Sequence, residues 1–325
     1  MKQQLPNKYL EVAGRGDVAE LHQMLKAHPE FLNKGGPFNR TLLWEATRRG
    51  RLPAVKYLVE RGAEVDATGG YNNESLVQLT PYCAAIYYRR GEIAAYLLSR
   101  GARLDVFRAA FLGDQAQVAR ALAADPDLLH SEDPFDSIYF MPLPAFAVAG
   151  GQAGLLAFLF QHGATIGPYS ALLLHLAARA ARMDLVAQLV AHGADVGAVD
   201  TGIFVAVSDL EIIRFLLDHG ASATRAGLSG FAPLIYVARG DKAESPEKAR
   251  MLLERGAQVN EIGPRGRTAL HYAAAAGHIE VMRVLLDHGA SLSLTDEAGA
   301  TPLSLARAGG KIAAVRTLTQ RGAEL

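Results

Sequence analysis

The chain has 325 residues, with 33 lysines and arginines against 33 aspartates and glutamates, and half of its residues are hydrophobic. This composition excludes a disordered chain, and the neutral charge argues against a general nucleic-acid binder, which would carry a basic excess. The single cysteine, Cys83, excludes an internal disulfide framework and a paired-cysteine zinc or redox motif.

Membrane and secretion signals are also missing from the sequence. The N-terminal residues lack the apolar stretch of a signal peptide, and no run of about 18 apolar residues occurs that would span a bilayer. We therefore expect a cytoplasmic protein that binds neither membrane nor nucleic acid.

A short helical pattern that ends in Gly-Ala recurs from one end of the chain to the other. Two further copies, at 21–33 and 118–130, have His-Pro or Asp-Pro in place of Gly-Ala. Together they make about ten units with an average period of about 33 residues, which is typical of stacked helix pairs. The Gly-Ala copies occupy residues 55–66, 94–105, 156–167, 186–197, 213–224, 249–260, 282–293 and 315–325.

Each Gly-Ala helix is preceded by a second short helix, most clearly at 268–278 and 301–311. Thr268 and Thr301 are suited to cap these helices. Gly220 and Gly289 are suited to the left-handed conformation that ends a helix. Neither helix of a pair can bury its apolar stripe alone, so the units are expected to stack.

The ninth unit, RGRTALHYAAAAGHIEVMRVLLDHGASLS, resembles the ankyrin repeat. The resemblance extends over the whole chain and implies an all-α ankyrin-repeat solenoid of stacked antiparallel helix pairs with β-hairpin finger loops and a concave recognition surface. We predict a single array over residues 1–325 with about ten repeats. Divergent units are expected at 5–33 and 106–130, and long finger loops at 67–79 and 131–140.

Large aromatic and arginine side chains depart from the repeat pattern mainly between residues 38 and 140. The resemblance implies that finger residues and the two residues before each helix-turn glycine face a partner. Tyrosine, tryptophan and arginine are also the types enriched in binding hot spots. The candidate partner-binding residues are Phe38, Asn39, Arg40, Trp44, Arg48, Arg49, Tyr71, Asn72, Asn73, Tyr87, Tyr88, Phe135 and Tyr139. The alternative for several of these aromatics is that they pack the longer fingers onto the stack.

Signatures of catalysis or of a cofactor are absent from the sequence. Seven of the ten histidines fall at repeat positions, and none belongs to an HExxH motif or a His/Cys cluster. Cys83 lies where the repeat places a packed helix, so a buried thiol is favoured over a nucleophile. We therefore expect no enzyme, no cofactor and no metal site.

The sequence as a whole favours a non-catalytic protein–protein interaction scaffold. An adaptor, an inhibitor or a toxin-neutralising binder that is monomeric when free fits this role, and its partner is another protein. The alternative is a small ligand or peptide held in an aromatic pocket of the N-terminal half, where the loops 67–79 and 131–140 fold over Trp44 and Tyr87.

Overall fold

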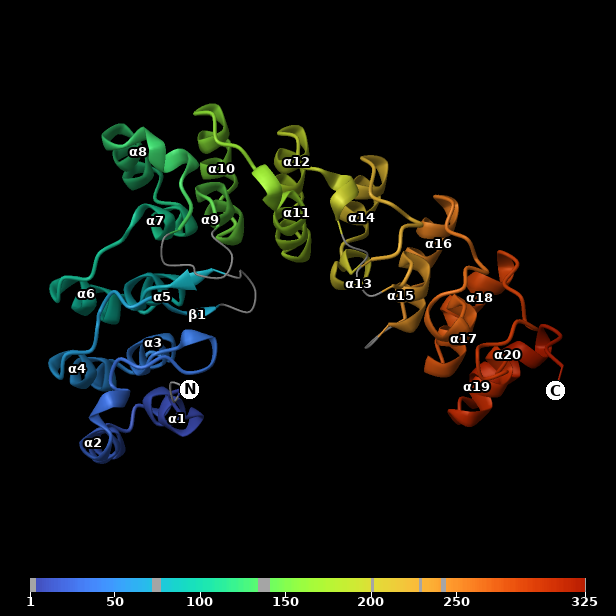
Figure 1. Cartoon of the computed structure of the whole chain (residues 1–325), viewed down its shortest axis with the longest axis horizontal. Coiled ribbons are helices and arrows are strands. Elements are labelled where there is room, and N and C mark those ends of the chain that lie inside the picture. The colour runs from blue at the N-terminus through green and yellow to red at the C-terminus, as the bar shows by residue number, and fades with distance from the viewer. Residues whose placement is uncertain are drawn as a thin grey trace. The chain divides into compact units, whose positions relative to one another are not determined.

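The computed structural model divides into two compact units, Met1–Gly167 and Pro168–Leu325, shown from blue to red in Figure 1. Each unit is built from short α-helices joined by turns and finger loops. The described residues are 4–71, 77–133, 141–199, 202–227, 230–240 and 244–324.

Within its described residues, unit 1 contains five pairs of α-helices. The pairs are α1 (Asn7–Arg15) with α2 (Val18–Ala27), α3 (Leu42–Arg48) with α4 (Leu52–Glu60), α5 (Pro81–Tyr87) with α6 (Gly91–Ser99), α7 (Val106–Leu112) with α8 (Gln115–Ala124), and α9 (Leu143–Ala149) with α10 (Ala153–Gln161). Three short 3-10 helices join them: η1 (Pro29–Phe31), η2 (Pro37–Asn39) and η3 (Pro126–His130). The first helices α1, α3, α5, α7 and α9 contact one another in that order, and α4 packs between α2 and α6.

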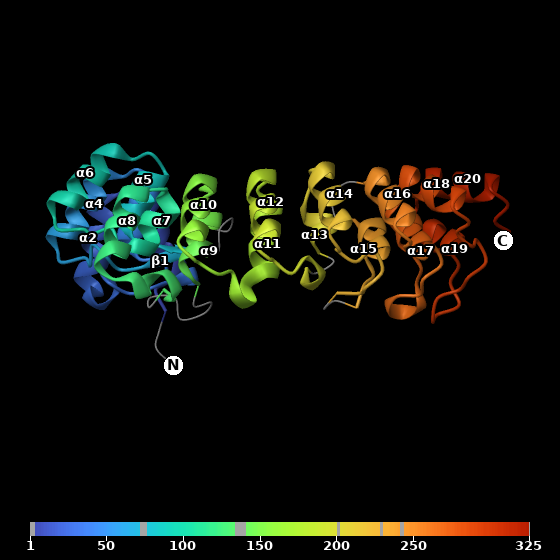
Figure 2. The ribbon, with the colours of Figure 1, turned by 90° about the horizontal axis from the view of Figure 1, so that it is seen from above.

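Unit 2 repeats this arrangement. Its pairs are α11 (Ser170–Arg179) with α12 (Met183–Ala191), α13 (Ile203–Ala206) with α14 (Leu210–Asp218), α15 (Pro233–Arg239) with α16 (Pro246–Glu254), α17 (Ala269–Ala276) with α18 (Ile279–Asp287), and α19 (Pro302–Ala308) with α20 (Ile312–Gln320). The 3-10 helices here are η4 (Gly167–Tyr169, which begins at the last residue of unit 1), η5 (Val196–Ala198) and η6 (Pro264–Gly266). Figure 2 shows α17 beside α19 and α18 beside α20.

The expected all-α stack of helix pairs is confirmed. The local signals act as anticipated, since Thr301 caps α19 by accepting a hydrogen bond from the Ser304 amide. Gly220 and Gly289 end their helices with φ of +105° and +83°. That residues 1–325 form one continuous array stays a prediction.

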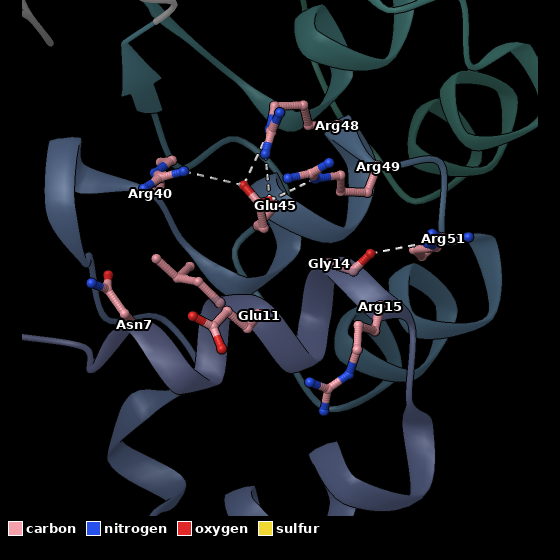
Figure 3. A pocket seen from close by; sticks show the side chains of 10 residues that line it. Asn7, Glu11, Gly14, Arg15, Arg40, Glu45, Arg48, Arg49 and Arg51 are labelled. Atoms are coloured by element: carbon pink, nitrogen blue, oxygen red, sulfur yellow. Dashed lines mark hydrogen bonds and ion pairs between the residues drawn. The ribbon is translucent and has the colours of Figure 1, made fainter.

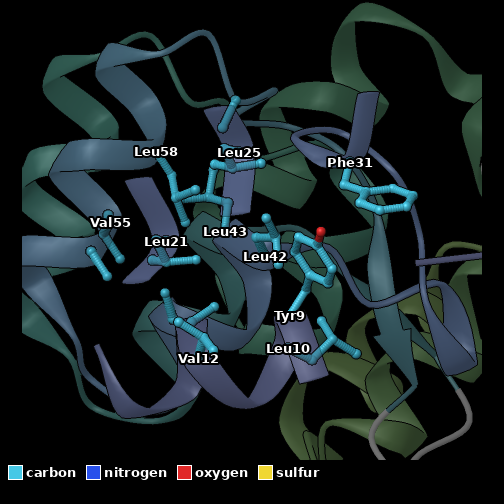
Figure 4. Packing of buried hydrophobic residues seen from close by; sticks show 14 of the residues in the cluster. Tyr9, Leu10, Val12, Leu21, Leu25, Phe31, Leu42, Leu43, Val55 and Leu58 are labelled. Atoms are coloured by element: carbon cyan, nitrogen blue, oxygen red, sulfur yellow. The ribbon is translucent and has the colours of Figure 1, made fainter. Parts of the chain in front are cut away.

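Burial of leucines between the two rows of helices stabilises unit 1. Figure 4 shows this core, in which Val12 and Leu21 of the first pair lie near Val55 and Leu58 of α4. Side chains from at least two successive helix pairs build the same cluster. The apolar face of one pair is therefore covered by its neighbour, which is the physical basis of a repeat stack.

A second set of contacts between successive pairs comes from the residue that immediately precedes the second helix of a pair. Its side chain donates a hydrogen bond to a carbonyl near the end of the first helix in the preceding pair, which satisfies a backbone group that the helix leaves open. The bonds are Arg51 Nε to Gly14 O at 3.0 Å, Arg90 Nε to Arg48 O at 3.4 Å, Gln152 Nε2 to Phe111 O at 3.1 Å, and His278 Nδ1 to Ala238 O at 3.0 Å.

The first long finger contains a β-hairpin, with strand β1 (Gly69–Tyr71) antiparallel to β2 (Gln78–Leu79). Strand β1 lies against η2 of the preceding finger, and Asn39 Nδ2 donates to the Thr68 carbonyl at 2.9 Å. A Cβ at Gly69 would lie 2.3 Å from the Asn39 carbonyl oxygen, so only glycine permits this approach. The second long finger is closed by a bridge between Glu132 and Pro142.

Candidate recognition surface

A pocket of about 580 Å³ opens between α1 and α3 in unit 1 (Figure 3). Charged side chains dominate its wall, and none of its lining residues is aromatic. We call it the α1–α3 pocket. It is lined by Asn7, Leu10, Glu11, Gly14, Arg15, Arg40, Glu45, Arg48, Arg49 and Arg51.

The Glu45 carboxylate forms the centre of this pocket, and its side chain is only 6% exposed. Arg48 binds it through two hydrogen bonds, Nη2 to Oε1 at 2.6 Å and Nε to Oε2 at 3.2 Å. Arg49 Nε donates to Oε1 at 3.2 Å, and Arg40 Nη1 lies 3.6 Å from Oε2. One buried carboxylate thus orients three guanidinium groups, as the dashed lines in Figure 3 show.

Local sequence explains why these groups meet. The Thr41 hydroxyl accepts a hydrogen bond from the Trp44 amide and so begins α3. Arg48 and Arg49 follow Glu45 by three and four residues, the spacing that places side chains on one helix face. Both arginines also lie at the carboxyl end of α3, where the helix dipole favours a cation.

Arginines outnumber acids in the wall of the α1–α3 pocket. Five arginines face two glutamates there, a net charge of +3. Arg49 is 56% exposed along its side chain, and Arg51 points its Nε at the Gly14 carbonyl, as Figure 3 shows. The pocket therefore offers guanidinium donors beyond those that Glu45 takes up.

Among the predicted partner-binding residues, Arg40, Arg48 and Arg49 come together in the α1–α3 pocket. Phe38 and Asn39 lie next to it in η2, where Phe38 is 59% exposed. The Arg40 guanidinium lies 5.9 Å from the centre of the Phe38 ring, a distance typical of a cation–π contact. These five residues form one contiguous area.

Trp44 does not belong to that exposed area, since it is 2% exposed. For this residue the structure agrees with the packing alternative. Its indole is buried within the stack, with the Arg48 guanidinium 5.9 Å from the ring. Within the described residues its Nε1 has no hydrogen-bond partner.

Tyr87 and Tyr88 lie one repeat further on, at the end of α5. Tyr87 is 37% exposed, and its ring packs 5.0 Å from Tyr88 and 5.2 Å from Phe111, measured between ring centres. This aromatic group is partly exposed to solvent, which suits either packing or recognition. Asn72, Asn73, Phe135 and Tyr139 lie outside the described residues, and for Tyr71 only the backbone in β1 is described.

Sequence reasoning did not predict Glu11, Glu45 or Arg51 as part of this surface. For Glu45 the signal was present, because its spacing to Arg48 and Arg49 is that of a helical ion pair. For Glu11 and Arg51 no local pattern existed, since each reaches the pocket only because α1 packs against α3.

A second pocket, of about 590 Å³, borders the turn that precedes α3 and is called the finger pocket. Its two charged lining residues, Glu64 and Asp66, are acidic. The finger pocket is lined by Asn33, Asn39, Thr41, Glu64, Val65, Asp66, Ala67 and Thr68. Neither pocket is lined by Trp44 or Tyr87, as the predicted aromatic pocket would require.

Arg108 of α7 fixes both long fingers and is completely buried. It binds the equally buried Asp133 through two bonds of 2.8 and 2.7 Å, and its Nε donates to the Gln78 carbonyl at 3.1 Å. Burial by itself lowers the pKa of Arg108, but its hydrogen bonds to Asp133 and the charge of Asp105 outweigh burial and raise it. One side chain thus ties the base of each long finger to the stack.

Cys83 lies near this arginine and is buried. Burial raises the pKa of its thiol far above the ordinary value, which keeps it protonated and unreactive. Across the described ranges, no three His, Cys, Asp or Glu side chains gather closely enough to hold a metal ion. Of the helices that the structure describes, none combines the length and apolar character needed to cross a bilayer.

A family model described as "Ankyrin repeats (3 copies)" matches residues 10–108, 174–263 and 242–325. The ankyrin repeat protein nuc-2 of Neurospora crassa is 25% identical over 300 residues, which are 84% of this chain and 27% of that protein. A Danio rerio protein named as a palmitoyltransferase, ZDHHC13, is 29% identical over 146 residues, 42% of this chain and 22% of that protein. The ankyrin repeat domain-containing protein SAT10 of Stachybotrys chartarum is 34% identical over 84 residues, 26% of this chain and 4% of that protein. This chain spans about a quarter or less of the length of these curated relatives.

Proposed function

Because this chain belongs to the ankyrin-repeat family, whose repeats are generally protein–protein interaction modules, we propose that it is a non-catalytic scaffold that recognises another protein through unit 1. The observation that carries this proposal is that the exposed Phe38 and Asn39 lie beside the α1–α3 pocket, whose wall includes the partly exposed Arg40 and the exposed Arg49. An exposed aromatic ring next to oriented arginines is the composition of a binding hot spot. The ankyrin fold is typically non-catalytic, and function resides in sites placed on such a fold.

The proposed mechanism is non-covalent and relies on rigidity. Arg40, Arg48 and Arg49 are already oriented by Glu45 in the free protein, so little side-chain entropy is lost when a partner binds. Such a binder can serve as an adaptor, an inhibitor or a toxin-neutralising protein. We propose that the protein is cytoplasmic, since its single cysteine cannot form an internal disulfide, and that it is monomeric when free.

The first prediction tests this surface by affinity purification from the native host. We expect Arg49→Glu combined with Tyr87→Ala to remove the co-purifying partner, because Arg49 is an exposed arginine of the proposed surface and Tyr87 is an exposed aromatic candidate one repeat further on. Arg49 is preferred to Arg48, whose two bonds to Glu45 also stabilise the fold.

The matched control is Arg265→Glu, an exposed arginine of unit 2 with the same change of charge. A partner that is retained by the unit 1 double variant and lost with Arg265→Glu would place recognition in unit 2 and overturn the proposal. Partner identity is read by mass spectrometry of the bound fraction.

A further inference from the structure

The α1–α3 pocket has donors that the protein itself does not use. Arg49 donates a hydrogen bond from Nε to Glu45, and Arg51 donates one from Nε to the Gly14 carbonyl. Within the described residues neither arginine gives its terminal Nη groups an acceptor. These are the planar, paired donors that match a carboxylate with two parallel hydrogen bonds.

Glu45 holds Arg48 and Arg49 close together against the mutual repulsion of their charges. Its buried carboxylate binds Arg48 most closely and holds Arg49 through the Nε edge only, so the outer edge of Arg49 stays open to solvent. The lining residues carry a net charge of +3 with Glu45 and Glu11 included, and it remains +2 when Glu20, which binds Arg15 at 2.6 Å, is counted as well. The pocket thus holds oriented arginines, carries a net positive charge and has hydrogen-bond donors without an acceptor among the described residues. These are the properties of a site for an anionic group.

The neighbouring finger pocket limits what kind of anion fits. It borders the same turn through Asn39 and Thr41, and its charged residues are Glu64 and Asp66. A long phosphodiester strand passing over the turn would leave the arginines and meet these two acids. A volume of about 580 Å³ in the α1–α3 pocket suits a few side chains.

We propose that the α1–α3 pocket binds a short acidic segment of the partner protein, with side-chain carboxylates paired to Arg49 and Arg51. This inference rests on the proposed function and names the chemistry that the partner presents. Phe38, beside Arg40 on the rim, contributes apolar contact to the flanking residues of that segment.

The test uses the full chain and a hexaglutamate peptide that carries a zwitterionic rhodamine at its N-terminus, with binding followed by fluorescence anisotropy at about 50 mM salt. Arg49→Gln is expected to weaken binding about three- to tenfold, the effect of losing one partly exposed arginine–carboxylate pair. Glu11→Gln is expected to strengthen binding about two- to threefold, because it removes a negative charge from the pocket wall.

Two variants of unit 2 make the same changes of net charge outside the pocket. Arg307→Gln and Glu254→Gln alter exposed residues of α19 and α16 and should change the affinity less than twofold. The fluorescence of Trp44, the sole tryptophan, checks that every variant retains a folded unit 1.

Three results would overturn the inference. The first is an equal loss of affinity in Arg49→Gln and Arg307→Gln. The second is no binding of hexaglutamate, and the third is tighter binding of a twelve-nucleotide oligothymidylate than of the peptide. If hexaglutamate fails to bind but Arg49→Glu with Tyr87→Ala still removes the native partner, the acidic-segment inference falls and the proposed function stands. If hexaglutamate binds in the pocket but the double variant still captures the native partner, the partner surface of the proposed function falls.

Discussion

Residues 36–49 in unit 1 and residues 263–276 in unit 2 follow the same sequence pattern and use it differently. Both begin with Gly-Pro and place an arginine and a threonine before a helix, which is α3 in one and α17 in the other. Both turns hold a side chain at positive φ, Phe38 at +58° and Arg265 at +64°. The backbones are alike, so the differences between the two segments come from their side chains.

In α17 the side chain three residues after the threonine of this pattern closes a hydrogen-bond network. His271 Nδ1 accepts from the Thr268 amide at 3.2 Å, and Nε2 donates to the Ala300 carbonyl of the next finger at 3.1 Å. In α3 the same position is Trp44, which is buried by apolar packing. At this position the unit 2 segment thus joins its neighbour through a hydrogen bond, and the unit 1 segment packs through the hydrophobic effect.

The remaining differences turn a neutral surface into a charged one. Tyr272 donates its hydroxyl to the Pro264 carbonyl at 3.0 Å, whereas Glu45 at the matching position accepts from arginines. Ala275 and Ala276 in α17 correspond to Arg48 and Arg49 in α3. Replacement of these three small or neutral side chains therefore supplies the charged residues that α3 itself contributes to the α1–α3 pocket.

The largest expected effect concerns an aspartate that holds an arginine in each unit. Asp133→Asn removes the buried carboxylate that binds the fully buried Arg108, leaves the partly exposed Asp105 at 3.5 Å, and should destabilise unit 1 by about 3–5 kcal/mol. Asp296→Asn should cost less in unit 2, because Arg267 is 22% exposed and water can solvate it. Urea unfolding, followed by Trp44 fluorescence and far-UV circular dichroism, measures the loss of stability in both variants. Equal losses of stability would contradict the expected difference between the two units.

The next effect tests the hydrogen-bond network of α17. His271→Ala should destabilise unit 2 by about 1–3 kcal/mol, since it leaves the Thr268 amide and the Ala300 carbonyl without their partner. The unfolding midpoint followed by Trp44 fluorescence, which reports on unit 1, should shift less than the midpoint followed by circular dichroism.

The same histidine gives a pH dependence. Burial lowers the pKa of His271 below its ordinary 6.5, so the unfolded chain binds a proton at a pH where the folded chain does not. Its stabilisation is therefore complete above the ordinary pKa and is lost as the pH falls toward the folded one. Unfolding midpoints between pH 7.5 and 5.5 should fall more steeply for the natural sequence than for His271→Ala, and parallel slopes would exclude this role.

The smallest effect compares the residue four positions after the threonine, which is Glu45 in unit 1 and Tyr272 in unit 2. Glu45→Gln should cost about 1–2 kcal/mol, because the arginines that it orients are partly exposed and retain water. Tyr272→Phe removes one hydrogen bond and should cost about 0.5–1.5 kcal/mol. Added salt should reduce the effect of Glu45→Gln and leave that of Tyr272→Phe unchanged.

Parts of the site could be predicted because they follow from local rules. Arg48 and Arg49 were recognised by their place before a helix-turn glycine, and Phe38 and Arg40 by their place in a finger. The burial of Trp44 does not follow from the sequence, since a large aromatic ring serves core and interface equally well. The pairing of Arg108 with Asp133 has no local signal, because 25 residues and an entire helix separate them.

The sequence by itself determined the repeat, the helix pairs and their caps, because a period of about 33 residues and short-range capping depend on neighbours along the chain. Only the tertiary structure decided that α1 lies against α3, which places Glu11 and Arg51 beside Glu45. It also decided that one arginine holds both long fingers. The reason is that charge and burial depend on which helices pack together, and packing brings together residues that no sequence spacing relates.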